Sequence, residues 1–91
     1  MPMYNAQVAA MLEEMADLLE IEGANPFRVR AYRNAAHAIG VLGENVADLV
    51  ARGEDLKAIP GVGSAIADKV AQIVTTGTMT QLEELRDRLP A

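Results

Sequence analysis

Two glycines that flank one valine, Gly61-Val62-Gly63, lie near the middle of a run of aliphatic residues. Glycine lacks a side chain, so both positions can adopt the positive φ of a tight turn and let the main chain approach another surface closely. The aliphatic residues on either side recur at helical spacing and include Leu56, Ile59, Ile66 and Val70. Residues 56–70 therefore predict a short helix, a tight hairpin and a second helix packed against the first.

The start of the second helix provides the chemistry of this motif. The first amides of a helix have no hydrogen-bond partner within the helix, and they lie at the positive end of its dipole. Ser64 follows the glycines and is a candidate cap for this helix. Exposed amides at a helix start are a binding site for phosphate groups. The pattern predicts a helix-hairpin-helix that binds a nucleic-acid backbone, and the alternative is an ordinary turn between two helices.

Length and composition allow one small domain over residues 1–91, with 51% hydrophobic residues to build its core. The chain has no cysteine, which excludes disulfides and thiolate zinc sites. We find no signal-peptide pattern and no apolar run of membrane-spanning length, so we expect a cytoplasmic monomer without a membrane partner. One Phe, two Tyr and no Trp argue against a stacking platform for single-stranded bases.

The net charge of −5 opposes a nucleic-acid partner, because Lys and Arg normally supply the affinity for phosphates. The charges are, however, unevenly distributed. The first expected helix has only acids among its charged residues, namely Glu13, Glu14, Asp17, Glu20 and Glu22. Residues 23–43 have three arginines and no acid, namely Arg28, Arg30 and Arg33. We expect the acids to form a solvated helix face and at least one of the arginines to face phosphate.

Apolar periodicity predicts helices and no strand. The expected helices cover residues 6–22, 26 to about 39–42, 46–52 and 65–76, followed by a last helix from Thr80 to just before Pro90. The expected N-terminal signals are Asn5, Asn25 with Pro26, and a capping box over residues 80–83. Gly23, Gly53 and Gly77 are the expected stops. The chain should form an all-α, compact bundle of four to five short helices.

For two of these helices the periodicity predicts which side chains are buried in the core. For the second helix the inner residues are Phe27, Ala31, Ala35, Ala38 and Ile39. For the last helix they are Leu82, Leu85 and Leu89. The alanines of the second helix indicate close contact with a neighbouring helix.

Two blocks of the sequence resemble a known family. The first block is Asn-Pro-Phe-Arg-Val-Arg-Ala-Tyr-Arg-Asn-Ala-Ala at 25–36, and the second is Ile-Pro-Gly-Val-Gly-Ser-Ala-Ile-Ala-Asp-Lys-Val at 59–70. Thr76-Gly77 and Leu-Glu-Glu-Leu at 82–85 follow in the same order. Together they resemble the N-terminal 8-kDa domain of the family X DNA polymerases, the DNA polymerase beta-like family. The Asn-Pro-Phe start is closest to the bacterial and archaeal members, which would place the chain with the nucleoid.

This resemblance implies sequence-independent binding to the 5′-phosphate side of gapped or nicked DNA, in repair of the base-excision type. In the best-studied relatives the domain also removes a 5′-deoxyribose phosphate by lyase chemistry. By position, Lys69 corresponds to the Schiff-base lysine of such a lyase and Tyr32 to a pocket tyrosine. The implied DNA-binding residues are Arg28, Arg33, Lys57, Gly61, Val62, Gly63, Ser64 and Ala65. The chain is too short for polymerase activity of its own, because nucleotidyl transfer needs a carboxylate-held metal pair on a larger scaffold.

The resemblance also implies a monovalent cation at the hairpin. The backbone carbonyls of Lys57, Ile59 and Val62 correspond to the positions that hold it in the family. Na⁺ or K⁺ would bridge these oxygens and a DNA phosphate, as suits a hard cation. No other cofactor is expected.

Several positions depart from the pattern of the animal enzymes. Ala65 replaces a lysine one turn before Lys69, Gln81 and Glu84 replace basic residues, and Phe27 replaces a histidine. Phosphate affinity should therefore be lower. A Schiff-base lysine must be partly uncharged to attack an aldehyde, and a cation beside it would favour that state.

Other interpretations of the same residues remain open. Lys69 could be a solvated lysine on an outer helix face, and Tyr32 an aromatic ring at the edge of the core. His37 has no metal-ligating partner within its own helix and is expected to be structural. The alternative function is a protein-interaction or assembly module, in which the acidic first helix binds a basic partner such as a repair factor.

Overall fold

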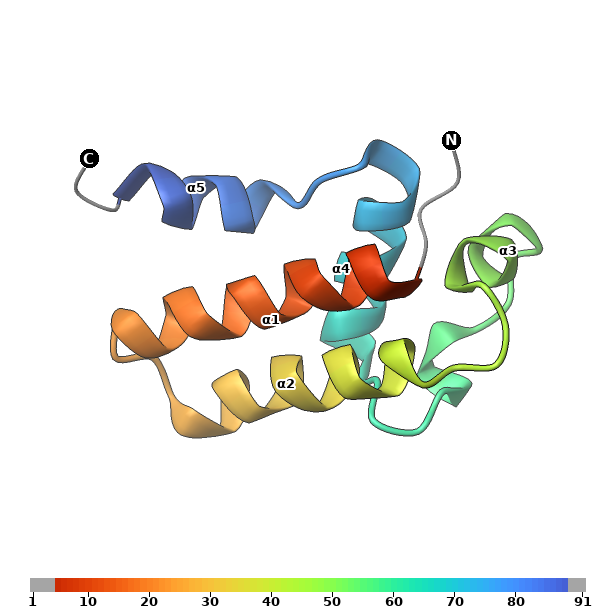
Figure 1. Ribbon diagram of the computed structural model, residues 1–91, viewed down its shortest axis with the longest axis horizontal. Helices are drawn as coiled ribbons and strands as arrows, with labels where there is room; N and C mark the ends of the chain where they lie inside the picture. Colours follow the sequence, from red (N-terminus) through yellow and green to blue (C-terminus); the bar gives the residue numbers. More distant parts are fainter. Residues whose placement is uncertain (1–4, 89–91) are drawn as a thin grey trace.

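Two long antiparallel helices, joined by a short turn, form the base of the fold (Figure 1). The computed structural model describes residues 5–88, apart from the side chain of Gln81. The element order is α1 (Asn5–Ile21), α2 (Pro26–Gly40), α3 (Val46–Ala51), the 3₁₀ helix η1 (Leu56–Ala58), α4 (Ser64–Thr76) and α5 (Thr80–Arg88). No strand occurs among these residues, which confirms the all-α prediction.

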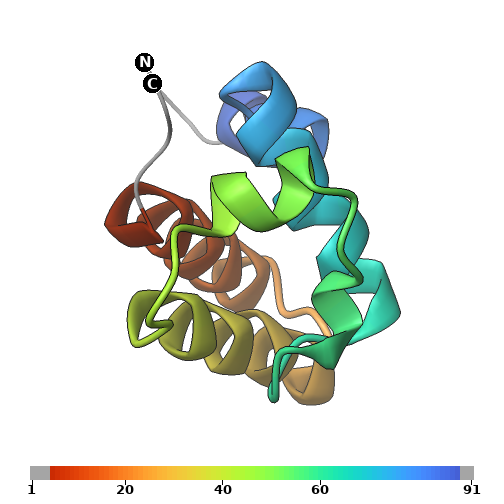
Figure 2. The same ribbon diagram turned by 90° about the vertical axis from the view of Figure 1, so that its right-hand side faces the viewer.

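The other elements pack around the α1–α2 pair. In Figures 1 and 2, α1 and α2 run side by side and α4 crosses them at a steep angle. The segment with η1 and the hairpin lies next to α2, and α5 lies beyond α1. No helix in the described part of the chain is long and apolar enough to cross a membrane.

The inner stripe of α2 differs from the prediction. Phe27 was expected inside, but it is 75% exposed. Ala35 and Ile39 are buried as predicted, whereas the N-terminal half of the helix buries Val29 and Tyr32 instead. Both registers have helical spacing and share Ala35 and Ile39, so periodicity alone could not separate them. The structure selects the register that buries the branched Val29 together with most of the Tyr32 side chain.

The turn between α1 and α2 has the predicted signals. Gly23 has a φ of +76°, which ends α1 in a left-handed conformation. The amide of Ala24 then donates to the carbonyl of Leu19 at 2.9 Å. The Asn25 side chain accepts from the amide of Phe27 at 2.8 Å and so caps α2.

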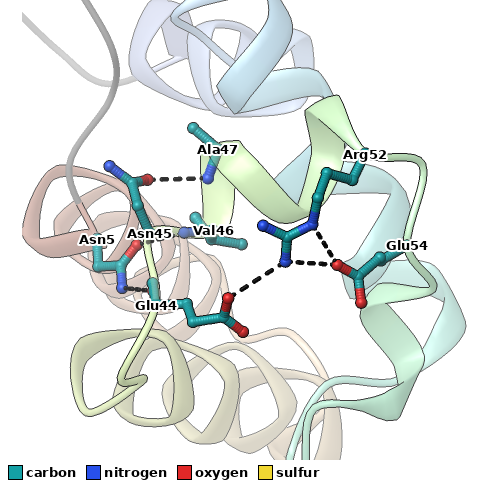
Figure 3. Close-up of polar contacts among 7 residues, drawn as sticks. All are labelled: Asn5, Glu44, Asn45, Val46, Ala47, Arg52 and Glu54. Carbon is teal, nitrogen blue, oxygen red and sulfur yellow. Dashed lines mark hydrogen bonds and ion pairs between the residues drawn. The ribbon is translucent and has the colours of Figure 1, made fainter.

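Asn5 does not cap α1, contrary to the prediction. It is the first residue of that helix, and its side chain reaches the start of α3 instead (Figure 3). The Asn5 carboxamide donates to the carbonyl of Glu44 at 2.7 Å and accepts from the amide of Val46 at 2.8 Å. Asn45 caps the next amide of α3, that of Ala47, at 2.9 Å. A residue far away in the sequence therefore satisfies the first amide of α3.

The loops on both sides of α3 are joined by Arg52 (Figure 3). Its guanidinium donates to Glu44 at 3.2 Å and to Glu54 at 2.6 Å. Gly53 has a φ of +72° and ends this helix as predicted. Asp55 follows and caps η1 by accepting from the amide of Lys57 at 3.0 Å.

The start of α5 does not form the predicted capping box. The amide of Glu83 donates to the Met79 carbonyl at 3.1 Å. Thr80 is held by the side chain of Gln72 on α4, which accepts from its amide at 3.3 Å and donates to its hydroxyl at 3.2 Å. Leu82 and Leu85 are buried as predicted, and Leu89 lies outside the described residues.

The acids of α1 are not a merely solvated face, contrary to the prediction. Arg33 of α2 lies among three of them, 3.0 Å from Glu13, 3.0 Å from Asp17 and 3.5 Å from Glu20. The side chains are largely exposed to solvent, so each pair adds little to stability. Their common effect is that one arginine joins two turns of α1 to α2.

The remaining acid of α1, Glu14, and Glu22 directly after the helix form ion pairs with α5. Arg86 donates two hydrogen bonds of 2.6 Å to Glu14, and this contact lowers the pKa of the Glu14 carboxyl. Arg88 lies 3.3 Å from Glu22. The acids on this side of the molecule therefore form ion pairs with arginines of both neighbouring helices, α2 and α5.

The Asn5→Ala variant tests the two hydrogen bonds by which Asn5 of α1 holds the start of α3. It removes two hydrogen bonds and leaves the amide of Val46 without its partner, so we expect a loss of about 1–2 kcal/mol in the free energy of unfolding. Urea unfolding followed by circular dichroism measures it. Asn34→Ala is the matched control, because the Asn34 side chain is exposed, and it should change stability by less than about 0.5 kcal/mol. Equal values for the two variants would contradict this role of Asn5.

Candidate nucleic-acid interface

The hairpin is a tight turn over residues 59–62. The amide of Val62 donates to the carbonyl of Ile59 at 3.0 Å, and Gly61 has a φ of +95°. Pro60 followed by a glycine of positive φ is the sequence of a type II turn. A Cβ atom added at Gly61 would lie 3.3 Å from the Ala38 Cβ and 3.4 Å from the Asn34 carbonyl oxygen. Gly61 is therefore required both by its backbone conformation and by the close approach of the hairpin to α2.

Gly63 does not have the predicted positive φ. Its φ is −86° and its ψ is 174°, an extended conformation that other residues adopt. A Cβ atom added here would meet nothing within 4 Å. Within the described residues, then, neither the backbone nor the packing requires a glycine at this position. The position faces open space that another molecule can approach.

The helix after the hairpin has an open start. Its N-cap is Gly63, so Ser64 is the first helical residue and does not cap α4 as predicted. No side chain caps this helix, and its first backbone bond runs from the amide of Ala67 to the carbonyl of Gly63 at 2.8 Å. Among residues 5–88 no acceptor is found for the amides of Ser64, Ala65 and Ile66.

A depression of about 370 Å³ joins this open start to α2. We call it the basic depression. Its lining residues are Arg28, Ala31, Tyr32, Gly63, Ser64, Ala65, Ile66 and Lys69. Two of them are cationic and none is acidic. The structure thus brings together Arg28, Tyr32 and Lys69, for which the family resemblance implies a phosphate contact, a pocket tyrosine and a Schiff-base lysine.

Tyr32 and Lys69 are both withdrawn from solvent at this site. Tyr32 is 3% exposed, and burial raises the pKa of its hydroxyl, an effect that the nearby Arg28 guanidinium opposes. The ring belongs to the core, and the hydroxyl lies near the Arg28 guanidinium. Lys69 is half-buried, so it is not a lysine on a fully solvated face.

A second depression, of about 500 Å³, lies on the other side of Ser64. We call it the acidic depression. It lies between α3, η1 and α4, and its lining residues are Val50, Gly53, Glu54, Asp55, Leu56, Lys57, Ser64, Ala67, Asp68 and Ala71. Lys57 therefore lies apart from Arg28 and Lys69. Sequence reasoning missed these acids, although Asp55 and Asp68 stand close to the hairpin in the sequence.

The remaining arginines of α2 lie outside both linings. Arg33 was assigned to DNA contact, but its guanidinium is held by the carboxylates of α1. Arg30 lies 5.8 Å from the centre of the exposed Phe27 ring, a cation–π contact. His37 is exposed, and no group of three or more His, Cys, Asp or Glu residues in the described part of the chain could hold a metal ion.

Comparisons with known proteins agree with this geometry. Residues 3–79 match the family described as "Helix-hairpin-helix domain". The chain is 26% identical over 88 residues to the DNA polymerase/3′-5′ exonuclease PolX of Bacillus subtilis, and 28% identical over 87 residues to DNA polymerase lambda of Rattus norvegicus. These alignments cover 97% and 96% of the chain but only 15% and 14% of the relatives. The chain thus corresponds to about a seventh of each polymerase.

The two hairpin glycines should respond differently to substitution. Gly61→Ala places a side chain at a φ of +95° and against α2, so it should cost at least about 1–2 kcal/mol of unfolding free energy. Gly63→Ala meets no such obstacle and should change stability by less than about 0.5 kcal/mol. Thermal and urea unfolding of both variants check this. A large loss in Gly63→Ala would show that this glycine has a role within the fold.

Proposed function

Because the chain belongs to the helix-hairpin-helix domain family, we propose that it binds DNA without sequence preference, through the phosphate backbone. The observation that supports this most is the open start of α4, where three successive amides have no acceptor among residues 5–88. Such amides donate to an anion and lie at the positive end of the helix dipole. The relatives are DNA polymerases by name, and we therefore propose DNA as the anionic ligand.

Each part of the site suits a phosphate group. Gly63 leaves the space through which a phosphate oxygen can reach the amides. Arg28 and Lys69 stand on one side of that position and supply two positive charges. All of these contacts would be made to the backbone, which fixes the position of DNA without reading its sequence. Affinity should be modest and strongly salt-dependent, because the chain has a net charge of −5.

We further propose a preference for gapped or nicked DNA with a 5′-phosphate, as in repair of the base-excision type. A terminal phosphate monoester has about 1.5–2 negative charges at neutral pH, while each internal diester has one. The terminal group therefore gains more from the paired cations of the basic depression. An end also fits into a depression more deeply than a continuous strand does.

A monovalent cation at the hairpin is part of this proposal. The donor set would be the neutral carbonyl oxygens of Lys57, Ile59 and Val62, and such oxygens suit Na⁺ or K⁺. The bond from Val62 to Ile59 keeps these two residues in one tight turn. The Ile59 oxygen retains a second lone pair for a cation. The cation would supply positive charge next to the bound phosphate.

Lyase activity on a 5′-deoxyribose phosphate is a second candidate function. Lys69 is half-buried and lines the depression that would hold the phosphate. Its amine would attack the C1′ aldehyde of the sugar and expel water to form an imine. Loss of a proton from C2′ would then break the bond between C3′ and its oxygen, which leaves with the 5′-phosphate of the downstream strand. Water would hydrolyse the imine that remains and restore the Lys69 amine. Arg28 would orient the phosphate during these steps, and Tyr32 would close one side of the site.

The alternative of an assembly module receives less support. It requires the acids of α1 to be free for a basic partner. Glu13, Asp17 and Glu20 form ion pairs with Arg33. Glu14, and Glu22 directly after α1, form ion pairs with arginines of α5. A basic protein would have to displace these contacts.

Arg28→Ala tests the phosphate site, with Arg30→Ala as the control on the same helix. Arg28 lines the basic depression and Arg30 does not, while both variants lose one positive charge. We expect Arg28→Ala to weaken binding to 5′-phosphorylated gapped DNA about five- to tenfold and to reduce the salt slope by about one. Arg30→Ala should have a smaller effect. Fluorescence titrations at several salt concentrations, with and without the 5′-phosphate, provide the measurement, and negligible binding of the wild type at low salt would disprove the proposal.

Borohydride trapping tests the lyase. It should reduce the imine and leave a covalent adduct with DNA that contains a 5′-deoxyribose phosphate. Lys69→Ala should abolish the adduct, whereas Lys57→Ala should retain it, because Lys57 lines the other depression. Gel electrophoresis detects the product. An adduct that survives in Lys69→Ala, or its absence in the wild type, would exclude this activity for Lys69.

A further inference from the structure

The start of α4 borders two depressions, and the residues that line them have opposite net charge. Ser64 lines both of them. On one side lies α2 with Arg28, and on the other lie η1 and α3, all in contact with α4. Figure 2 shows the start of α4 beside the hairpin and η1, next to α2. A phosphate on the open amides would therefore stand at the boundary between the two depressions.

The charges differ strongly across this boundary. The basic depression is lined by Arg28 and Lys69 and by no acid. The acidic depression is lined by three carboxylates against one lysine, namely Glu54, Asp55, Asp68 and Lys57. A neighbouring phosphate would be attracted on the first side and repelled on the second.

Asp68 is the least compensated of the three carboxylates. Glu54 forms an ion pair with Arg52. Asp55 accepts a hydrogen bond from the amide of Lys57 as the cap of η1. Asp68 is exposed and has no ion pair among residues 5–88. It follows Ser64 by one helical turn, a separation of about 5–6 Å along the helix surface.

We propose that Asp68 is a specificity-determining residue, which makes the α4 site favour strand ends over continuous strands. This rests on the proposed function. A phosphate inside a continuous strand has neighbours on both sides, so one of them must pass over the acidic depression. A strand that begins at a 5′-phosphate can leave in the direction of the basic depression alone. Asp68 thus selects against the continuous strand.

The distances make this effect measurable. The Debye length at physiological salt is about 8 Å, so a neighbouring phosphate that passes over the acidic depression is not fully screened from Asp68. A unit charge at roughly 7 Å in water changes a binding constant about threefold. Lys57 partly offsets the acids, but it cannot reverse the charge of three carboxylates.

The experiment compares Asp68→Asn with Asp87→Asn. Asp87 is an exposed acid of α5 that lines neither depression, so its variant has the same change in net charge away from the site. Each protein is titrated at low salt with gapped DNA carrying a 5′-phosphate and with continuous duplex of the same sequence. Circular dichroism verifies that each variant is folded, and Asp68→Ala serves as a second charge-removing variant.

We expect Asp68→Asn and Asp68→Ala to bind continuous duplex about threefold more tightly and the gapped DNA nearly as the wild type does, so that the preference falls about threefold. Asp87→Asn should leave the preference unchanged. An equal gain on both DNAs, or no change on either, would overturn the role of Asp68 while the proposed DNA binding stands. If the wild type binds neither DNA at low salt, the proposed function fails and this inference fails with it.

Discussion

The contact between the hairpin and α2 determines where every functional group of this site lies. Gly61 comes so close to the Asn34 carbonyl and to Ala38 that a Cβ atom would crowd the interface. Because the turn rests on α2 there, α4 begins beside the preceding turns of α2, which present Arg28 and Tyr32. A hairpin held further away would still have open amides, but no cations next to them. The basic depression thus depends on a close backbone approach rather than on the motif alone.

The distribution of ion pairs explains how an acidic chain can present a basic site. The four acids of α1, and Glu22 directly after this helix, all have an arginine partner, supplied by α2 or α5. None of these acids is among the residues that line the basic depression with Arg28 and Lys69. Net charge is therefore a poor guide to this surface. Local charge around the open amides determines what the site attracts, since screening limits each group to its neighbourhood.

Most local signals in the sequence were confirmed, although Ser64 does not cap α4 and Gly63 has no positive φ. The signals that needed a distant partner were wrong. The stops at Gly23, Gly53 and Gly77 and the cap at Asn25 act within a few residues, and the structure has all of them. Asn5 and the start of α5 were misread, because their partners lie 41 and 8 residues away in the sequence. The acids of α1 were misread for the same reason. The residues of the basic depression were found through family resemblance, whereas the acids opposite them became visible only once α3, η1 and α4 were placed together.

The two glycines of the hairpin look like a pair in the sequence, but different physical constraints apply at the two positions. Gly61 satisfies a positive φ and a close internal contact, so the fold itself accounts for it. Gly63 has an ordinary φ and no neighbour within 4 Å, so the fold does not account for it. Glycine at such a position costs conformational entropy on folding. Its place next to three amides that have no acceptor among residues 5–88 fits the proposed approach of a phosphate oxygen to the backbone there.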